Sequence, residues 1–261
     1  MAAQFNPFSE SSQDYAAFRP SYPEGLFRWI VSQCERHDAA WDCGTGTGQA
    51  AAALAPHFRE VLATDVSAEQ IAQAPPIANV RYSVQPAEST NLTPASIDLI
   101  VVAQALHWFR FADFWREVGR VSREGAFFCA WGYDWFRTDD LVERRLVDPF
   151  RAIVEPFWAK NNRILWAGYR SADVEMPFEP EPVPPFSIKL RWTARRLLAY
   201  MTTWSAYKRS QADGVAARQM AELIASVGDV LASTEILDVE TQLRTLAAHV
   251  RSTGAADRAS R

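Results

Sequence analysis

The chain has 261 residues, 48% of them hydrophobic and 22% charged, which is enough apolar material for one large domain or for a domain with a cap. Its net charge of −4, with Lys and Arg scattered, argues against a dedicated nucleic-acid surface, and no apolar run approaches the roughly 18 residues of a membrane span. Three cysteines without CxxC spacing, and an N-terminus unlike a signal peptide, favour buried free thiols in a reducing cytoplasm.

The first 36 residues predict a helical cap. Residues 9–18 have the pattern of a short helix, and Arg19–Pro23 breaks it because a residue that precedes proline is pushed out of helical geometry. Pro23 suits a first helical position. A second helix is predicted by the apolar residues that follow at helical spacing, Leu26, Phe27, Ile30 and Val31.

Residues 37–135 predict an α/β core. Strands are expected at 39–43, 60–65, 80–85, 97–103 and 125–131. Helices are expected at 49–55, from the capping box at 67–70 to Pro75, and at 111–121. This alternation predicts a doubly wound sheet with helices on both faces, which binds ligands at the carboxyl ends of its strands. The side chains at those ends are Asp42, Asp65, Glu88, Gln104, His107 and Trp131.

Residues 136–250 predict helices and closing strands. Helical pattern covers 139–169, prolines make 177–185 extended or irregular, and a strand is expected at 186–192. Thr193 can cap a helix that includes Trp204, a further helix runs from 215 to 227 and ends at Gly228, and a last strand is expected at 237–243. The predicted division is therefore 1–36 cap, 37–135 core, 136–250 helical insertion with closing strands, and 251–261 disordered tail.

The stretch Trp41-Asp42-Cys43-Gly44-Thr45-Gly46-Thr47-Gly48 organises the core. Three glycines within five positions mark a backbone that turns sharply and lets a ligand approach its amides. A helix follows at once, so the amides of its first turn point into the turn. This arrangement predicts a cradle for a nucleotide-like ligand.

The spacing of these glycines differs from the dinucleotide fingerprint GxGxxG, because the third glycine comes one residue early and Gln49 stands where Gly or Ala is required. The pattern Asp-x-Gly-x-Gly-x-Gly, with an acidic strand end at Asp65 and Glu88 after the third strand, resembles the class I S-adenosylmethionine-dependent methyltransferases. Three further segments resemble the small-molecule branch of methyltransferase type 11, similar to trans-aconitate methyltransferase. They are Phe18-Arg19-Pro20-Ser21-Tyr22-Pro23, Ala105-Leu106-His107-Trp108-Phe109 and Thr203-Trp204-Ser205-Ala206-Tyr207.

The resemblance implies a Rossmann-like, mostly parallel seven-stranded sheet whose last strand is antiparallel. It also implies that segments 1–35 and 136–230 cap the site. The chain departs from the family at Glu240–Val250, where the pattern is polar and half helical instead of a clear strand.

The resemblance also implies how S-adenosyl-L-methionine is bound. Asp65 would accept two hydrogen bonds from the ribose diol, or else only cap a turn. Asp42 would bond the loop amides or the ligand ammonium, and Glu88 with Ala87 would read the adenine amino group unless Glu88 is a surface residue. Arg19 could bind the ligand carboxylate or be merely solvated. The remaining candidates around the cofactor are Tyr15, Gly44, Thr45, Gly46, Gly48, Val66, Gln104 and Ala105.

The part of the site that would bind the methyl acceptor is predicted from fewer residues. His107 is the candidate general base, needed only if the acceptor must lose a proton, and it is equally a packing residue beside Trp108. Aromatic side chains either wall the acceptor pocket or line a core: Tyr22, Trp108, Trp131 and Trp204. No metal-ligand spacing occurs.

The prediction is methyl transfer from S-adenosylmethionine to a small molecule, with a carboxylate or hydroxyl acceptor favoured. An enzyme that methylates amide or exocyclic amine nitrogen would show Asn/Asp-Pro-Pro-aromatic after the fourth strand, where this chain has Ala103-Gln104-Ala105-Leu106. The alternatives are an NAD-dependent oxidoreductase and a non-catalytic protein that binds the cofactor. We expect a cytoplasmic monomer or homodimer without nucleic-acid or membrane partners.

Overall fold

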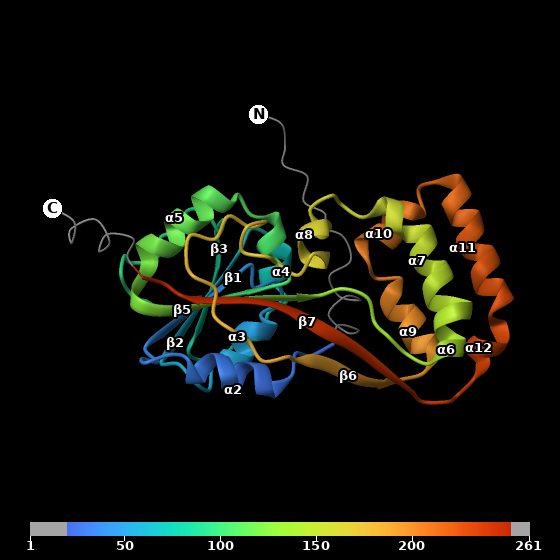
Figure 1. Ribbon diagram of the computed structural model, residues 1–261, viewed down its shortest axis with the longest axis horizontal. Helices are drawn as coiled ribbons and strands as arrows, with labels where there is room; N and C mark the ends of the chain where they lie inside the picture. The colour runs from blue at the N-terminus through green and yellow to red at the C-terminus, as the bar shows by residue number, and fades with distance from the viewer. Residues whose placement is uncertain (1–19, 252–261) are drawn as a thin grey trace. The chain divides into compact units, whose positions relative to one another are not determined.

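The computed structural model describes residues 20–251 and divides into two compact units (Figure 1). The sheet unit comprises residues 22–133, 163–186 and 243–251, and the helical unit comprises 20–21, 134–162 and 187–242. The helix expected at 9–18, the cofactor candidates Tyr15 and Arg19, and the expected tail from residue 252 lie outside the described residues. The division of the chain predicted at residues 36, 135 and 250 stays a prediction.

Seven strands form a sheet in the order β3-β2-β1-β4-β5-β7-β6. They are β1 (Ala39–Cys43), β2 (Glu60–Asp65), β3 (Val80–Val84), β4 (Ile97–Ala103), β5 (Ser122–Tyr133), β6 (Ser187–Trp192) and β7 (Leu237–His249). Strands β1 to β5 pair in parallel, and β7 runs antiparallel to both β5 and β6. The predicted fold class, a mostly parallel seven-stranded α/β sheet, is confirmed.

The last strand, β7, corrects the expectation for residues 240–250, since the strand continues through them to His249. Its first half alternates between buried and exposed residues and pairs with β6. Its second half pairs with β5, from Leu243 opposite Tyr133 to His249 opposite Phe127, and three successive residues, Leu246–Ala248, are buried there. A strand that passes from one covered face to two loses its alternating pattern, so its sequence no longer indicates a strand.

Helices cover both faces of the sheet unit, with α5 on one side and α2 and α3 on the other (Figure 1). The elements are α2 (Glu24–Ser32), α3 (Gln49–Leu54), α4 (Ala68–Ile71), η1 (Leu106–Trp108), α5 (Phe111–Val121) and α8 (Asn162–Trp166). Helix α4 is a single turn, shorter than the helix expected to reach Pro75. Strand β5 begins at Ser122, three residues before its predicted start.

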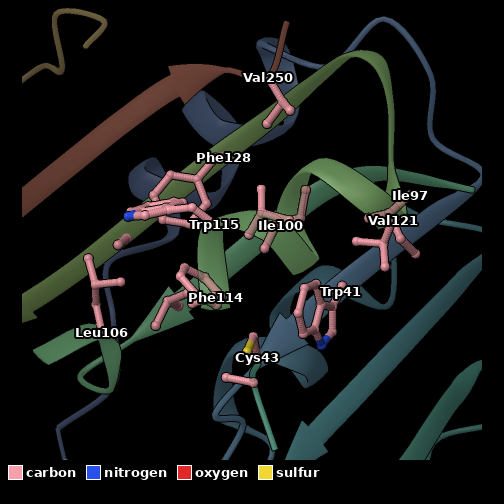
Figure 2. Close-up of a cluster of buried hydrophobic side chains, with 14 of the residues drawn as sticks. Trp41, Cys43, Ile97, Ile100, Leu106, Phe114, Trp115, Val121, Phe128 and Val250 are labelled. Atoms are coloured by element: carbon pink, nitrogen blue, oxygen red, sulfur yellow. The ribbon is translucent and has the colours of Figure 1, made fainter. Parts of the chain in front are cut away.

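The hydrophobic core lies between α5 and the sheet. Figure 2 shows Phe114 and Trp115 of α5 packed beside Phe128 of β5 and Ile100 of β4, with Trp41 of β1 nearby. The Phe114 and Trp115 ring centroids lie 4.8 Å apart, and Trp115 and Phe128 meet edge to face at 5.0 Å. Burial of this many large side chains fixes the register of β1, β4 and β5, and therefore fixes where their carboxyl ends lie.

The helical unit is built from short elements. They are α6 (Asp140–Val142), the π-helical turn η2 (Glu143–Val147), α7 (Asp148–Val154), η3 (Glu155–Phe157), α9 (Ala194–Met201), α10 (Ser205–Ser210), α11 (Gly214–Ser226) and α12 (Gly228–Ala232). Two expectations are wrong here. Trp204 does not share the helix of Leu197, because α9 ends at Met201 and Trp204 is the N-cap of α10; Gly228 begins α12 instead of only ending α11.

Tryptophans of the helical unit form a core of their own. Trp204 is 8% exposed and packs against Trp135, Trp158 and Tyr200, with ring centroids 5.2, 5.8 and 5.6 Å away. Arg151 lies over the Trp135 ring at 4.7 Å. Within residues 20–251, none of the helices has the length and apolar character needed to cross a membrane.

Candidate active site

The glycine loop, residues 44–48, follows β1 and leads into α3. Gly44, Gly46 and Gly48 all have left-handed backbones, with φ of 71°, 56° and 81°. The amides of Gly44 and Thr45 donate to the Thr64 carbonyl at 2.8 and 2.9 Å, so the loop is tied to the end of β2. A Cβ added to Gly44 would lie 2.7 Å from the Cβ of Ala105, which shows how closely the loop after β4 approaches.

Asp42 of β1 anchors the glycine loop, and its side chain is completely buried. Its Oδ2 accepts the Thr45 hydroxyl at 2.6 Å and the Ala51 amide at 2.9 Å, so one carboxylate oxygen joins the loop to the first turn of α3. These contacts account for the loop-stabilising role considered for Asp42. A contact with the ligand ammonium stays a prediction.

Asp65 ends β2 beside the loop. Its Oδ2 accepts the Gly46 amide at 2.8 Å, and its Oδ1 accepts the Ser67 amide at 2.9 Å. The side chain therefore fixes both the glycine loop and the start of α4, where Ser67 caps the helix by accepting the Gln70 amide. The adjacent Val66 is 61% exposed.

Three carboxylates converge at this end of the sheet. Burial raises the pKa of the Cys43 thiol, and the negative charges of Asp42, Asp65 and Glu88 raise it further. The Glu88 side chain is 10% exposed and its Oε1 accepts the Arg110 amide at 2.9 Å, directly before α5. Glu88 thus lies half-buried in the turn that follows β3, and Ala87 beside it is buried.

The segment after β4 carries backbone strain. Gln104 is left-handed with φ of 59°, although it is not glycine, and its amide donates to the Trp131 carbonyl at 2.8 Å. Its side-chain amide donates to the Tyr133 carbonyl at 3.3 Å. Left-handed non-glycine residues are uncommon and gather at functional sites. The turn at Gln104 directs the chain so that Ala105 reaches the glycine loop.

His107 lies on η1 and is 3% exposed. Its Nδ1 is 2.7 Å from the hydroxyl of Tyr169, and the two rings are stacked with centroids 5.9 Å apart. Burial lowers the pKa of His107 to about 3, so its imidazole is neutral at physiological pH. Tyr169 lies 62 residues further along the chain, and no spacing in the sequence indicated this pair.

The aromatic candidates divide between the two units. Tyr22 and Trp131 pack edge to face at 5.4 Å in the sheet unit and are 7% and 0% exposed. The indole Nε1 of Trp131 is buried and has no hydrogen-bond partner among the described residues. Trp108 is half-buried, with its ring 5.0 Å from that of His107. Trp204 belongs to the helical unit and its core, so its role in an acceptor site stays a prediction.

Known proteins resemble this chain over the residues that form the glycine loop and the strand ends. The model of a family described as a methyltransferase domain matches residues 41–130. A candidate methyltransferase of Dictyostelium discoideum is 32% identical over 204 residues, 77% of this chain and 77% of that protein. A Saccharomyces cerevisiae protein is 29% identical over 131 residues, which are 47% of this chain and 45% of that protein. Its name describes a candidate S-adenosylmethionine-dependent methyltransferase.

Two further relatives bear on fold and chemistry. The solved structure of a candidate type II methyltransferase from Anaeromyxobacter dehalogenans has a TM-score of 0.81 and 35% identity, and the match covers 90% of this chain and 99% of that one. A malonyl-[acyl-carrier protein] O-methyltransferase of a Marinomonas species is 29% identical over 134 residues, 49% of each chain.

The fold and these relatives define a class I S-adenosylmethionine-dependent methyltransferase. The chain belongs to the methyltransferase family of type 11, whose domain model covers the glycine loop and the strands from residue 41 in β1 to residue 130 in β5. The predicted cofactor, S-adenosyl-L-methionine, and the predicted enzyme class are confirmed. The alternative of an NAD-dependent oxidoreductase is therefore wrong.

Proposed function

We propose that this methyltransferase transfers the methyl group of S-adenosylmethionine to a carboxylate oxygen of a small molecule, with a hydroxyl acceptor as the second candidate. The observation that carries the proposal is the state of His107. The histidine is 3% exposed, its Nδ1 is engaged by Tyr169, and burial holds its pKa at about 3. An acceptor that arrives already ionised needs no base from this residue.

The donor half fits the cofactor. Asp42, Asp65 and Glu88 converge beside a loop of left-handed glycines, where a polar, cationic ligand with an amine head group would be held. We assign the ribose to Asp65, the adenine to Ala87, Glu88 and Val66, and the amino-acid part to the loop, Gln104 and Ala105. Bound there, S-adenosylmethionine supplies an activated methyl group, and the protein mainly orients the acceptor and excludes water.

Proton chemistry separates the two acceptor classes. A hydroxyl must lose a proton during methyl transfer, and general-base catalysis is efficient when the pKa of the base is near the working pH. A histidine with a pKa of about 3 is several units too weak. A carboxylate is already deprotonated at neutral pH, since carboxyl groups ionise near pH 4. The site therefore favours the carboxylate.

The buried donor of Trp131 supports the same acceptor. Its indole N–H has no hydrogen-bond acceptor among residues 20–251, and a buried donor without a partner costs about 1–3 kcal/mol. An anionic oxygen bound nearby would satisfy it. The Marinomonas relative, whose name describes an O-methyltransferase acting on a malonyl group, gives a precedent for this chemistry.

A panel of labelled-methyl transfer assays tests the proposal. Small mono- and dicarboxylic acids are compared with the corresponding alcohols, phenols and amines at equal concentration. We expect transfer to the acids, in a product that mild alkali hydrolyses to methanol, because methyl esters are cleaved by base and methyl ethers are not. Alkali-stable products from alcohols alone would contradict the carboxylate assignment.

The panel includes two controls. The first is binding of S-adenosylhomocysteine without acceptor, which separates a silent acceptor screen from a protein that fails to bind cofactor. The second is the Asp42→Ala variant, which loses an anchor of the glycine loop and should be inactive on every acceptor. Cofactor binding with no transfer to any acceptor of the panel would contradict both proposed acceptor classes.

A further inference from the structure

The indole N–H of Trp131 is an exception among the buried tryptophans of the sheet unit. Trp41 donates its N–H to the Thr64 hydroxyl at 2.9 Å, and Trp115 donates to the Val174 carbonyl at 2.7 Å. Trp131 is 0% exposed, yet its Nε1 has no hydrogen-bond partner in the described part of the chain. Buried tryptophans usually satisfy this donor, because leaving it unpaired costs free energy.

The rings around Trp131 do not satisfy the donor. Tyr22 and Phe27 both meet the indole edge to face, with ring centroids 5.4 and 5.8 Å away. A contact between an N–H and an aromatic ring is weak beside a hydrogen bond to oxygen. These neighbours reward apolar area and shape, which a phenylalanine would also provide. Packing alone therefore does not explain why this position carries an indole.

The donor stands at the edge of the sheet where ligands of this fold bind. Trp131 lies opposite Ala103, the last residue of β4, and its carbonyl accepts the Gln104 amide at 2.8 Å. The next residue, Ala105, is the one that a Cβ on Gly44 would meet at 2.7 Å. Trp131 is thus joined to the glycine loop through the first two residues after β4. An acceptor that faces the methyl group lies over this same edge.

We propose that Trp131 orients the methyl acceptor: its indole N–H donates to one oxygen of the acceptor carboxylate and leaves the other oxygen to attack the methyl group. The attacking oxygen forms the O–CH3 bond with a lone pair as the S–CH3 bond breaks and its electron pair returns to sulfur. No proton leaves the acceptor, so no base is required. This assignment rests on the proposed function and adds the residue that selects the acceptor.

A donor without a lone pair discriminates between acceptors. The indole nitrogen donates a hydrogen bond but cannot take up a proton. On an alcohol, its hydrogen bond would engage the same oxygen that must attack, and the hydroxyl proton would find no base in this residue. A carboxylate has a second oxygen, so orientation and attack are separated. A neutral donor also withdraws less charge from the attacking oxygen than an arginine would.

The burial of Nε1 determines how the acceptor reaches it. The atom is closed to solvent, so the acceptor oxygen arrives when a neighbouring side chain rotates, as side chains commonly do on binding. A hydrogen bond made in so dry a place is stronger than one at the surface. The free energy that the unpaired donor costs the folded chain is then recovered when the acceptor binds.

The first experiment compares Trp131→Phe with Trp115→Phe in thermal unfolding. Both substitutions remove the same ring atoms from a buried position, so the difference between the two variants reports on the N–H. Trp115→Phe also leaves the Val174 carbonyl without its donor, and its melting temperature should fall further than that of Trp131→Phe, by roughly 2–4 °C. Equal losses would show that the N–H of Trp131 is paired and would overturn the proposal whatever the acceptor is.

The second experiment measures methyl transfer to an acid that the wild-type protein methylates. Trp131→Phe should raise KM for that acid by about tenfold or more, the worth of one hydrogen bond to a charged group. The Kd for S-adenosylhomocysteine should stay at its wild-type value, which a general loss of structure would not allow. Trp115→Phe is the matched control and should leave KM unchanged. An unchanged KM in Trp131→Phe would overturn the role of Trp131.

Nitrogen-15 spectra of the wild-type protein decide if Trp131→Phe does not fold. The ten tryptophans give ten indole N–H signals, and that of Trp131 is assigned through its contacts with the rings of Tyr22 and Phe27. Adding the acid together with S-adenosylhomocysteine should move this proton downfield and leave the paired donors of Trp41 and Trp115 in place. A Trp131 signal that does not move at saturating acid would overturn the proposal.

The outcomes separate this inference from the proposed function. Transfer to acids with a wild-type KM in Trp131→Phe would leave the carboxylate assignment in place and remove Trp131 from it. Transfer to alcohols alone, recognised by alkali-stable products, would overturn both.

Discussion

The glycine loop and the His107 cluster, defined here as His107, Tyr169, Tyr22 and Trp131, lie in the same unit but are held in different ways. Backbone amides hold the loop, and its anchors Asp42, Thr64 and Asp65 lie within 20 residues of it in the sequence. The cluster is held by side chains that come from the turn after α8, from β5 and from the segment before α2.

The difference predicts how each region responds to substitution. A loop built from left-handed glycines has few permitted backbones, so an added Cβ damages it whatever the side chain is. The aromatic rings fix the packing of the cluster, whereas a few hydroxyl groups and ring nitrogen atoms set its polarity. Changes there should alter acceptor preference more than folding.

The largest effect is expected from Gly44→Ala. The alanine would have to adopt φ of 71°, which costs roughly 1–2 kcal/mol, and its Cβ would meet that of Ala105 at 2.7 Å, for which overpacking costs about 1–3 kcal/mol more. We expect a clear loss of stability in urea unfolding, together with loss of S-adenosylhomocysteine binding by calorimetry.

Gly119→Ala is the matched control for this substitution. Gly119 lies in α5, where an added Cβ meets nothing within 4 Å, and alanine is favoured over glycine in a helix by about 0.5–1 kcal/mol. This variant should be slightly more stable than wild type and bind the cofactor product normally. Equal tolerance of alanine at both glycines would show that the loop is not held as described.

The loop is also the part of the site that sequence predicts best. Gly44, Gly46 and Gly48 are neighbours in the chain, and the strand ends that supply Asp42 and Asp65 follow from the alternation of apolar strands and helices. Local spacing and one topological rule, that ligands bind at the carboxyl ends of parallel strands, were therefore enough. The sheet class followed from the same alternation.

The cluster could not be predicted in this way. Tyr169 meets His107 across 62 residues, through a left-handed turn after α8 and a gap left by Gly132 on β5. Neither a strained tyrosine nor a close packing contact has a signature in a single sequence. The end of β7 was missed for a related reason, because burial on two faces erased its alternation.

The second prediction concerns Asp65→Ala, which tests whether the loop and the ligand share one anchor. The carboxylate accepts the Gly46 and Ser67 amides, and a hydrogen bond to a charged group is worth about 1.5–3 kcal/mol. We expect S-adenosylhomocysteine affinity to fall by that amount. Asp65→Asn keeps one acceptor oxygen and should lose less.

Thermal unfolding without ligand accompanies these affinity measurements. A loss of melting temperature that exceeds the loss of affinity would assign Asp65 to the loop alone. Unchanged affinity in Asp65→Ala would remove it from the cofactor site.

The smallest effect is a pH dependence carried by His107. Its pKa is about 3 in the folded protein against 6.5 in an unfolded chain, so below pH 6.5 the unfolded state binds a proton that the folded state does not. The contribution is fully present above pH 6.5 and is lost as pH falls toward 3, by up to about 1.4 kcal/mol for each pH unit. Urea unfolding at pH 6.5 and 5.5 should show roughly 1 kcal/mol of this loss in wild type but not in His107→Gln.

Tyr169→Phe distinguishes burial from hydrogen bonding as the cause of this slope. The substitution removes the hydroxyl but keeps the ring over the imidazole, so the desolvation that lowers the pKa of His107 remains and the slope should persist. A cluster whose pH-dependent stability survives the loss of one hydroxyl group is therefore the opposite of the glycine loop, where conformation and function are lost together. A slope that vanished in Tyr169→Phe would erase that contrast.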